Sequence, residues 1–185
     1  SKLNLKMIEN IDKPALSALW PSKKDLNVVL DLGANIECND QNLVDFAELG
    51  SALYKSLFPD ETPKVSLLNV GSEEMKGTEM LKLASTKLKE LSNADNFIYK
   101  GYIEGNNIMT GQSNVIITDG FTGNIALKTA EGTSNFIISE LKKALSSTLI
   151  GKFSSLLNFN NLNKFKNKLD PRLYNGAILL GLDKP

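Results

Sequence analysis

The chain has 185 residues, of which 42% are hydrophobic and 23% charged, and this composition excludes a collagen-like, disordered or all-membrane protein. It contains one cysteine, Cys38, and no histidine, so an intrachain disulfide framework and histidine-based catalytic or metal sites are excluded within it. Basic and acidic residues balance at 21 each, and this zero net charge gives no overall bias towards nucleic acid.

The opening of the chain carries no sign of a targeting segment. Its first ten residues lack the apolar core of a signal peptide, and no run of about 18 apolar residues is long enough to span a membrane. We therefore expect a single α/β domain over residues 1–185, located in the cytoplasm.

Short apolar segments predict the strands of a sheet. A weak one lies at Leu3–Ile8. The stronger ones are Val28–Leu32, Val65–Val70, Phe97–Ile103 and Val115–Thr118. All of these stronger segments except the third are near-continuous apolar runs, which is typical of strands covered on both faces in a parallel sheet.

Helical periodicity fills the intervals between these strands. It predicts a helix over Leu43–Leu57 with Asp40 as its N-cap, a second over Met80–Leu91 and a long third over about Gly123–Leu145. Two prolines suggest a further short helix at Pro14–Trp20. Strands that alternate with helices predict βαβ units and a mostly parallel sheet.

The segment 142–168 differs from the rest of the chain. Six lysines and no acidic residue lie between Glu140 and Asp170, and they alternate with leucines and phenylalanines. This pattern predicts one or two basic amphipathic helices that turn near Asn158–Asn161. Such helices pack on the domain or on a second subunit, or they contact an anionic membrane surface or an acidic carrier protein.

Three of the predicted strands end in a polar residue and a glycine before the next helix. The three loops read DLGAN (31–35), NVGSEE (69–74) and DGFTGN (119–124). Ligands of parallel sheets bind beyond the carboxyl ends of the strands, so we expect these loops to line one crevice. Glycines and free N–H groups at helix starts favour an anion such as phosphate. None of the loops is a complete nucleotide-binding fingerprint, which disfavours an ATPase or an ordinary NAD enzyme.

Charged side chains near the loops are candidates for binding an anion. Lys76 and Lys128 supply positive charge, and the glycines beside Lys76 favour it. Asp31 and Asp119 would repel phosphate, so we expect them to orient a lysine or to accept from backbone N–H groups. Cys38 has no histidine in this chain to activate it and is interpreted as a bystander.

Five segments resemble a known family over almost the whole chain. They are DLGAN (31–35), LLNVGSEEMKGTE (67–79), GYIEGNNI (101–108), TDGFTGNIALKTAEG (118–132) and LDPRLYNGAILLGL (169–182). The chain resembles PlsX, the phosphate acyltransferase family of bacterial phospholipid synthesis. Members of that family begin with a strand and a glycine-rich DAMGGD-type turn and end with an SHG segment. The sequence contains neither, so the resemblance covers the central and C-terminal parts of the family.

This resemblance implies a fold and a reaction. The fold is a Rossmann-like αβα sandwich related to phosphate acetyltransferases, in a homodimer at the inner membrane surface. The reaction transfers a fatty acyl group from acyl carrier protein to inorganic phosphate, with no metal or cofactor. Phosphate is substantially dianionic at neutral pH and attacks a thioester without a protein base, so the lack of histidine is no obstacle.

The resemblance also implies roles for individual residues. Lys76 is expected to bind the attacking phosphate or the developing oxyanion, and Asn124 to donate to the same centre. Asp119 is expected to orient its neighbours. The residues expected to shape the anion site are Gly33, Asn35, Gly71, Gly120, Thr122 and Gly123.

Two alternatives remain open at this stage. In the first, the acyl group comes from acyl-CoA and not from the carrier protein. In the second, the chain is a non-catalytic module that docks on a membrane or on a carrier protein. Binding of nucleic acid is disfavoured because the basic segment lacks a recognition motif.

Overall fold

The computed structural model describes residues 7–9, 11–93, 95–169 and 178–183. Their elements are β1 (Ala15–Pro21), β2 (Leu26–Leu30), α1 (Asp40–Leu57), β3 (Lys64–Leu68), α2 (Glu79–Leu91), β4 (Ile98–Ile103), the 3-10 helix η1 (Gly105–Thr110), β5 (Val115–Ile117), α3 (Gly120–Ser146), α4 (Leu149–Leu157), α5 (Phe159–Leu169) and β6 (Ile178–Leu180). All four strong strand predictions and the three main helix predictions are confirmed, with shifts of a few residues at their ends.

The strands form one sheet in the order β4-β3-β5-β2-β1-β6. Neighbours among β4, β3, β5 and β2 are parallel, whereas β1 is antiparallel to both β2 and β6. The expected strand at Leu3–Ile8 falls mostly outside the described residues, although Met7 makes an isolated antiparallel bridge with Leu182. The prediction of a mostly parallel α/β sheet is therefore confirmed.

The short helix predicted at Pro14–Trp20 is wrong, because this segment is strand β1. Both prolines lie where a strand tolerates them, outside its start and at its last residue. A tight turn then reverses the chain into β2, with the backbone N–H and the hydroxyl of Ser22 donating to the carbonyl of Asp25. Pairing with β2 and β6 decided the structure of a segment that is too short to be assigned by periodicity.

Helices cover both faces of the sheet. Side chains of Val28, Val65 and Val115 face α1 and α2 in one buried cluster, whereas Val29 and Ile116 face the start of α3 and η1 in another. This alternation explains why β2 and β5 are almost continuously apolar. The result is the αβα sandwich that the sequence predicts.

The start of α1 differs in detail from the prediction. Asn39, not Asp40, is the N-cap, because its side chain accepts from the N–H of Asn42 while the Asn42 side chain accepts from Asn39 in return. Asp40 is the first helical residue, where a carboxylate is favoured by the helix dipole, and it pairs with Lys87 on α2 at 2.7 Å.

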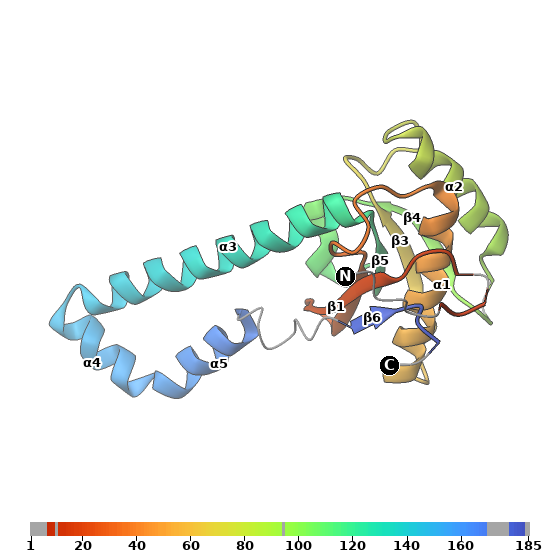
Figure 1. Cartoon of the computed structure of the whole chain (residues 1–185). Helices are drawn as coiled ribbons and strands as arrows, with labels where there is room; N and C mark the ends of the chain where they lie inside the picture. Colours follow the sequence, from red (N-terminus) through yellow and green to blue (C-terminus); the bar gives the residue numbers. More distant parts are fainter. Residues whose placement is uncertain (1–6, 10, 94, 170–177, 184–185) are drawn as a thin grey trace, which may run out of the picture.

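Helix α3 leaves the body of the domain. Only its first turn, at Gly120 and Gly123, is buried. The whole helix is about 40 Å long at 1.5 Å per residue and runs away from the sheet, and α4 and α5 fold back towards the sheet (Figure 1). We call α3 beyond Gly132, together with α4 and α5, the arm. The prediction of one or two amphipathic helices is confirmed with two, α4 and α5, which are separated at Asn158. Within the described residues, no helix is both long and apolar enough to cross a bilayer.

Candidate functional site

Three loops meet at the carboxyl edge of the parallel strands. We call them the Asp31 loop (residues 31–35, after β2), the Asn69 loop (residues 69–78, after β3) and the Asp119 loop (residues 118–124, after β5). Because β5 lies between β2 and β3 and all three are parallel, the Asp119 loop lies between the other two. The glycine-bearing loops that the sequence singled out are thus neighbours in space.

The Asp31 loop is organised by a buried carboxylate. Asp31 accepts from the N–H groups of Leu16, Gly33, Ala34 and Asn35 at 2.7–3.2 Å. The Asn35 amide donates to Asp31 at 2.8 Å and to the carbonyl of Pro14 at 2.6 Å. Asp31 therefore accepts from backbone N–H groups, as expected, whereas both side-chain hydrogen bonds of Asn35 stay within the protein.

The start of α3 packs directly on this loop. A Cβ at Gly120 would lie 2.5 Å from the carbonyl oxygen of Asn35, and one at Gly123 would overlap the carbonyl oxygen of Asp31. Gly33 in turn faces Asn124. A Cβ built at Gly33 would lie 3.6 Å from the Cβ of Asn124. The structure therefore brings five of the predicted site residues together here, with Asn124 exposed in the first turn of α3.

Asp119 is the N-cap of α3. Its carboxylate accepts from both the N–H and the hydroxyl of Thr122 at 2.8 Å. This contact holds the Thr122 side chain against Asp119 at the start of the helix. The sequence placed the start of the helix at Gly123, three residues late, because the glycines that allow close packing are poor helix formers.

The Asn69 loop carries the predicted catalytic lysine. Lys76 Nζ lies 2.9 Å from Glu73, and both side chains are more than half exposed. A Cβ at Gly71 would collide with the Lys76 side chain, so the lysine lies over this glycine. The hydrogen bond from Lys76 lowers the pKa of the Glu73 carboxyl below its ordinary value. Any anion that binds Lys76 must therefore compete with an ionised Glu73.

An apolar cavity of about 590 Å³ opens beside these loops. It lies between the Asn69 loop, the start of α2 and the start of α3. Polar groups of Asn69, Thr78, Asp119 and Thr122 reach it. Its apolar lining comes from Leu68, Val70, Met80, Leu81, Ile125 and Ala126. Lys76 and Asn124 do not line it, but each is adjacent in sequence to a residue that does.

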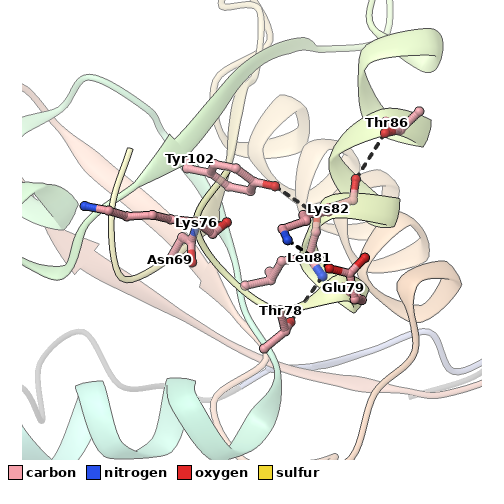
Figure 2. A network of polar contacts seen from close by, with 8 residues as sticks. All are labelled: Asn69, Lys76, Thr78, Glu79, Leu81, Lys82, Thr86 and Tyr102. Atoms are coloured by element: carbon pink, nitrogen blue, oxygen red, sulfur yellow. Dashed lines mark hydrogen bonds and ion pairs between the residues drawn. The ribbon is translucent and has the colours of Figure 1, made fainter. Parts of the chain in front are cut away.

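Two residues of the site were not among the predicted ones. Asn69 binds the two ends of its own loop, and Thr78 accepts from the N–H of Leu81 as the N-cap of α2 (Figure 2). The signal for Asn69 was present, since it follows β3 directly, as Asp31 follows β2, and Asp119 lies two residues after the end of β5. Lys128, the other candidate lysine, pairs with Glu131 at 2.9 Å on α3.

The remaining candidates for chemistry are limited. Burial raises the pKa of the Cys38 thiol above its ordinary value of 9.0, and this agrees with a bystander role. In the described part of the chain, no three acidic, cysteine or histidine side chains gather as a metal site would require.

The fold has relatives among solved structures. A phosphotransacetylase from Streptococcus pyogenes superposes with a TM-score of 0.59 at 18% identity, over 98% of this chain and 49% of that one. EutD phosphotransacetylase from Staphylococcus aureus gives a TM-score of 0.54 at 19% identity, over 71% of this chain and 45% of that one. The fold is therefore that of the phosphotransacetylases.

Sequence comparison identifies the family. The family model described as "Fatty acid synthesis protein" matches residues 1–185, and the chain belongs to this family. It is 68% identical over 185 residues to the phosphate acyltransferase of Pelagibacter ubique (strain HTCC1062), covering all of this chain and 55% of the relative. It is 46% identical over 182 residues to that of Maricaulis maris (strain MCS10), covering 98% of this chain and 51% of the relative. The chain thus spans about half the length of these curated relatives.

Proposed function

We propose that this chain corresponds to the central and C-terminal parts of a phosphate acyltransferase, which transfers a fatty acyl group from acyl carrier protein to inorganic phosphate. The observation that carries the proposal is the meeting of three glycine-bearing loops at one sheet edge, in a chain whose close relatives are named phosphate acyltransferase. We use "full-length protein" below for this chain extended to the length of those relatives.

The proposed step needs no protein base. An oxygen of the phosphate dianion attacks the carbonyl carbon of the thioester, and the C–O bond forms as the carbonyl becomes an oxyanion. The oxyanion then collapses, the C–S bond breaks, and the thiolate leaves to take a proton from water. Catalysis consists of holding the phosphate and stabilising the oxyanion, which an ammonium group and amide N–H groups can do.

The loops supply the groups for both tasks. Lys76 brings a positive charge on the Asn69 loop, and Asn124 brings an amide in the first turn of α3. At the start of that helix the N–H groups of Gly120 and Thr122 already donate to the carbonyl of Asn35 and to the carboxylate of Asp119. The helix therefore favours an anion through its dipole and not through these N–H groups. The carboxylates of Asp31 and Asp119 are engaged by N–H and hydroxyl donors, so they oppose the anion less than unpaired carboxylates would.

The apolar cavity beside the Asn69 loop suits the acyl chain. Half of its lining residues are apolar, and its polar lining belongs to the same loops that would hold the phosphate. An alkyl chain in this cavity would place its thioester end at the rim.

The arm suits a membrane surface. Its α4 helix exposes most of its large apolar side chains, for example Leu149 at 83% and Ile150 at 80%, and the segment 142–168 has lysines without acidic residues. A groove of about 720 Å³ between α3, α4 and α5 has the same apolar and basic character. Anionic lipid headgroups would attract the lysines while the apolar side chains enter the interface. We propose this contact, together with a cytoplasmic homodimer.

Acyl phosphate production by the full-length protein tests the reaction. Hydroxylamine traps acyl phosphate, and the donors to compare are acyl carrier protein and CoA carrying the same acyl group. We expect turnover with the carrier-linked donor, and turnover with CoA alone would instead support the acyl-CoA alternative. No product with either donor would contradict the proposal and favour a non-catalytic docking module.

Two substitutions test the residue roles. Lys76→Ala and Asn124→Ala should each lower turnover by about 10²-fold, the scale for losing one oxyanion donor. Lys82→Ala is the matched control for the first, because Lys82 also pairs with a glutamate three residues away, at 2.8 Å (Figure 2). Asn135→Ala, on an exposed turn of α3, is the control for the second. Normal turnover in both site variants would refute the assignment.

Sedimentation with vesicles tests the arm. Replacing Phe153, Leu156 and Leu157 with serine should reduce binding to vesicles of anionic phospholipid while turnover of soluble donors is kept. Unchanged sedimentation would show that the arm does not bind the membrane, and would favour its packing against another protein surface, such as the second subunit of a homodimer.

A further inference from the structure

The Asn69 side chain closes the loop that carries Lys76. It is 92% buried at the end of β3, and its Oδ1 accepts from the N–H of Val70 at 2.8 Å. Its Nδ2 donates to the carbonyl of Lys76 at 3.1 Å (Figure 2). One side chain at the end of β3 thus holds the backbone of Val70, at the start of the loop, and the backbone of the candidate lysine, Lys76, near its end.

The rest of the loop is built around this amide. Gly77 has a φ of +95°, and a Cβ there would lie 2.6 Å from Asn69 Oδ1. Only glycine combines this backbone with this close approach. Thr78 then caps α2, and the backbone N–H of Asn69 donates to Ile103 on β4 at 2.9 Å. The loop is therefore anchored to β4 before Lys76 and to α2 after it.

An amide is the chemical group that this position requires. A carboxylate would accept from Val70 equally well, but it could not donate to the carbonyl of Lys76. Asp31 and Asp119, at the corresponding strand ends, only accept, and each engages N–H groups of its own loop. The neutral amide of Asn69 also avoids a further carboxylate beside the proposed anion, in addition to those of Asp31, Asp119 and Glu73.

We infer that Asn69 is a positioning residue, which places the Lys76 ammonium for phosphate by holding both ends of its loop. The inference rests on the proposed function, because it assigns Asn69 a role through Lys76. Asn69 itself does not touch the reacting atoms in this account. A shift of about 1 Å in a binding group can cost about 10²-fold in rate, so a loosened loop should be visible in the kinetics.

The test measures kcat and the KM for phosphate in the full-length protein. Asn69→Ala and Asn69→Asp should each lower kcat/KM for phosphate by about 10²-fold. In a Lys76→Ala background the same substitutions should cost less than about threefold, because a residue that acts through Lys76 has nothing left to position. If the Asn69 substitutions lower kcat/KM by the same factor with Lys76→Ala as without it, their role is merely structural and the inference is overturned.

A matched control separates positioning from stability. Asn27 is also buried, and its amide donates to the carbonyl of Ile108 at 2.6 Å, at the opposite end of β2. Asn27→Ala should lower the melting temperature without changing the KM for phosphate. If Asn69→Ala does not fold, Asn69→Asp and Gly77→Ala carry the test with the same expected losses.

The outcomes distinguish a failure of the proposed function from a failure of the positioning role of Asn69. Full activity of Lys76→Ala contradicts the proposed function at this residue. An inactive Lys76→Ala together with normal Asn69 variants contradicts the positioning role alone.

Discussion

The close approach of α3 to the Asp31 loop gives a prediction about Gly123. Replacing Gly123 with alanine would place a methyl group against the carbonyl of Asp31 and 2.7 Å from Thr118 Cγ2. The main obstacle is backbone, which cannot rotate aside as the end of a flexible side chain can. Over-packing of this kind costs about 1–3 kcal/mol, and the favourable helix propensity of alanine offsets only about 1 kcal/mol of it.

The same helix supplies the matched control. Gly132 is also within α3, and a Cβ there would have no neighbour within 4 Å. Gly132→Ala should therefore leave the stability unchanged or raise it by up to about 1 kcal/mol. The two substitutions are chemically identical, so the difference between them reports the contact with the Asp31 loop.

Thermal unfolding followed by circular dichroism measures the difference. For a chain of this size each kcal/mol shifts Tm by about 2–4 °C, so Gly123→Ala should melt several degrees below Gly132→Ala. In the full-length protein, Gly123→Ala should also weaken phosphate binding, because it pushes the start of α3 off the loop. Equal melting temperatures for the two variants would refute the packing argument.

Three further predictions follow from the charges around the site. Lys76 pairs with Glu73, so Glu73→Gln should lower the KM for phosphate severalfold; an unchanged KM would mean that the carboxylate does not compete. Burial raises the pKa of Cys38, so its alkylation by iodoacetamide should keep accelerating up to pH 9, and a plateau near pH 7 would contradict this. The hydrogen bond from Lys87 lowers the pKa of Asp40 below 3.8, so the pair stabilises the fold above that pH and loses its effect as the pH falls through the lower value. Lys87→Met should therefore cost less than about 1 kcal/mol at pH 7 and less again in strong acid, where only the hydrogen bond from Lys87 to the Gln41 amide remains, and a cost independent of pH would exclude the ion pair as its cause.

Much of the fold could be predicted because burial on both faces leaves a clear pattern. Val28–Leu32 and Val115–Thr118 are near-continuous apolar runs, and the loops after them contain glycine, so the parallel sheet and its site edge were visible in the sequence. Segment Ala15–Pro21 was misassigned because its structure comes from pairing with β2 and β6, which are distant interactions that local periodicity does not report.

The sequence predicted the loops of the site and several of their residues, but not the residue that holds the Lys76 loop in place. Glycines and lysine have recognisable preferences, so Gly123 and Lys76 stood out. Asn69 did not, because its importance lies in two hydrogen bonds to backbone groups up to seven residues away, and an asparagine at a strand end has many other uses. Likewise, the sequence predicted the helices of the arm but not that α3 would carry them away from the sheet.

A crystal structure of the full-length protein with inorganic phosphate tests the central claim most directly. The account predicts one phosphate ion within hydrogen-bonding distance of both the Lys76 ammonium and the Asn124 amide, with Glu73 displaced from the lysine. A phosphate bound elsewhere, or a Lys76 and an Asn124 too far apart to touch the same ion, would contradict it.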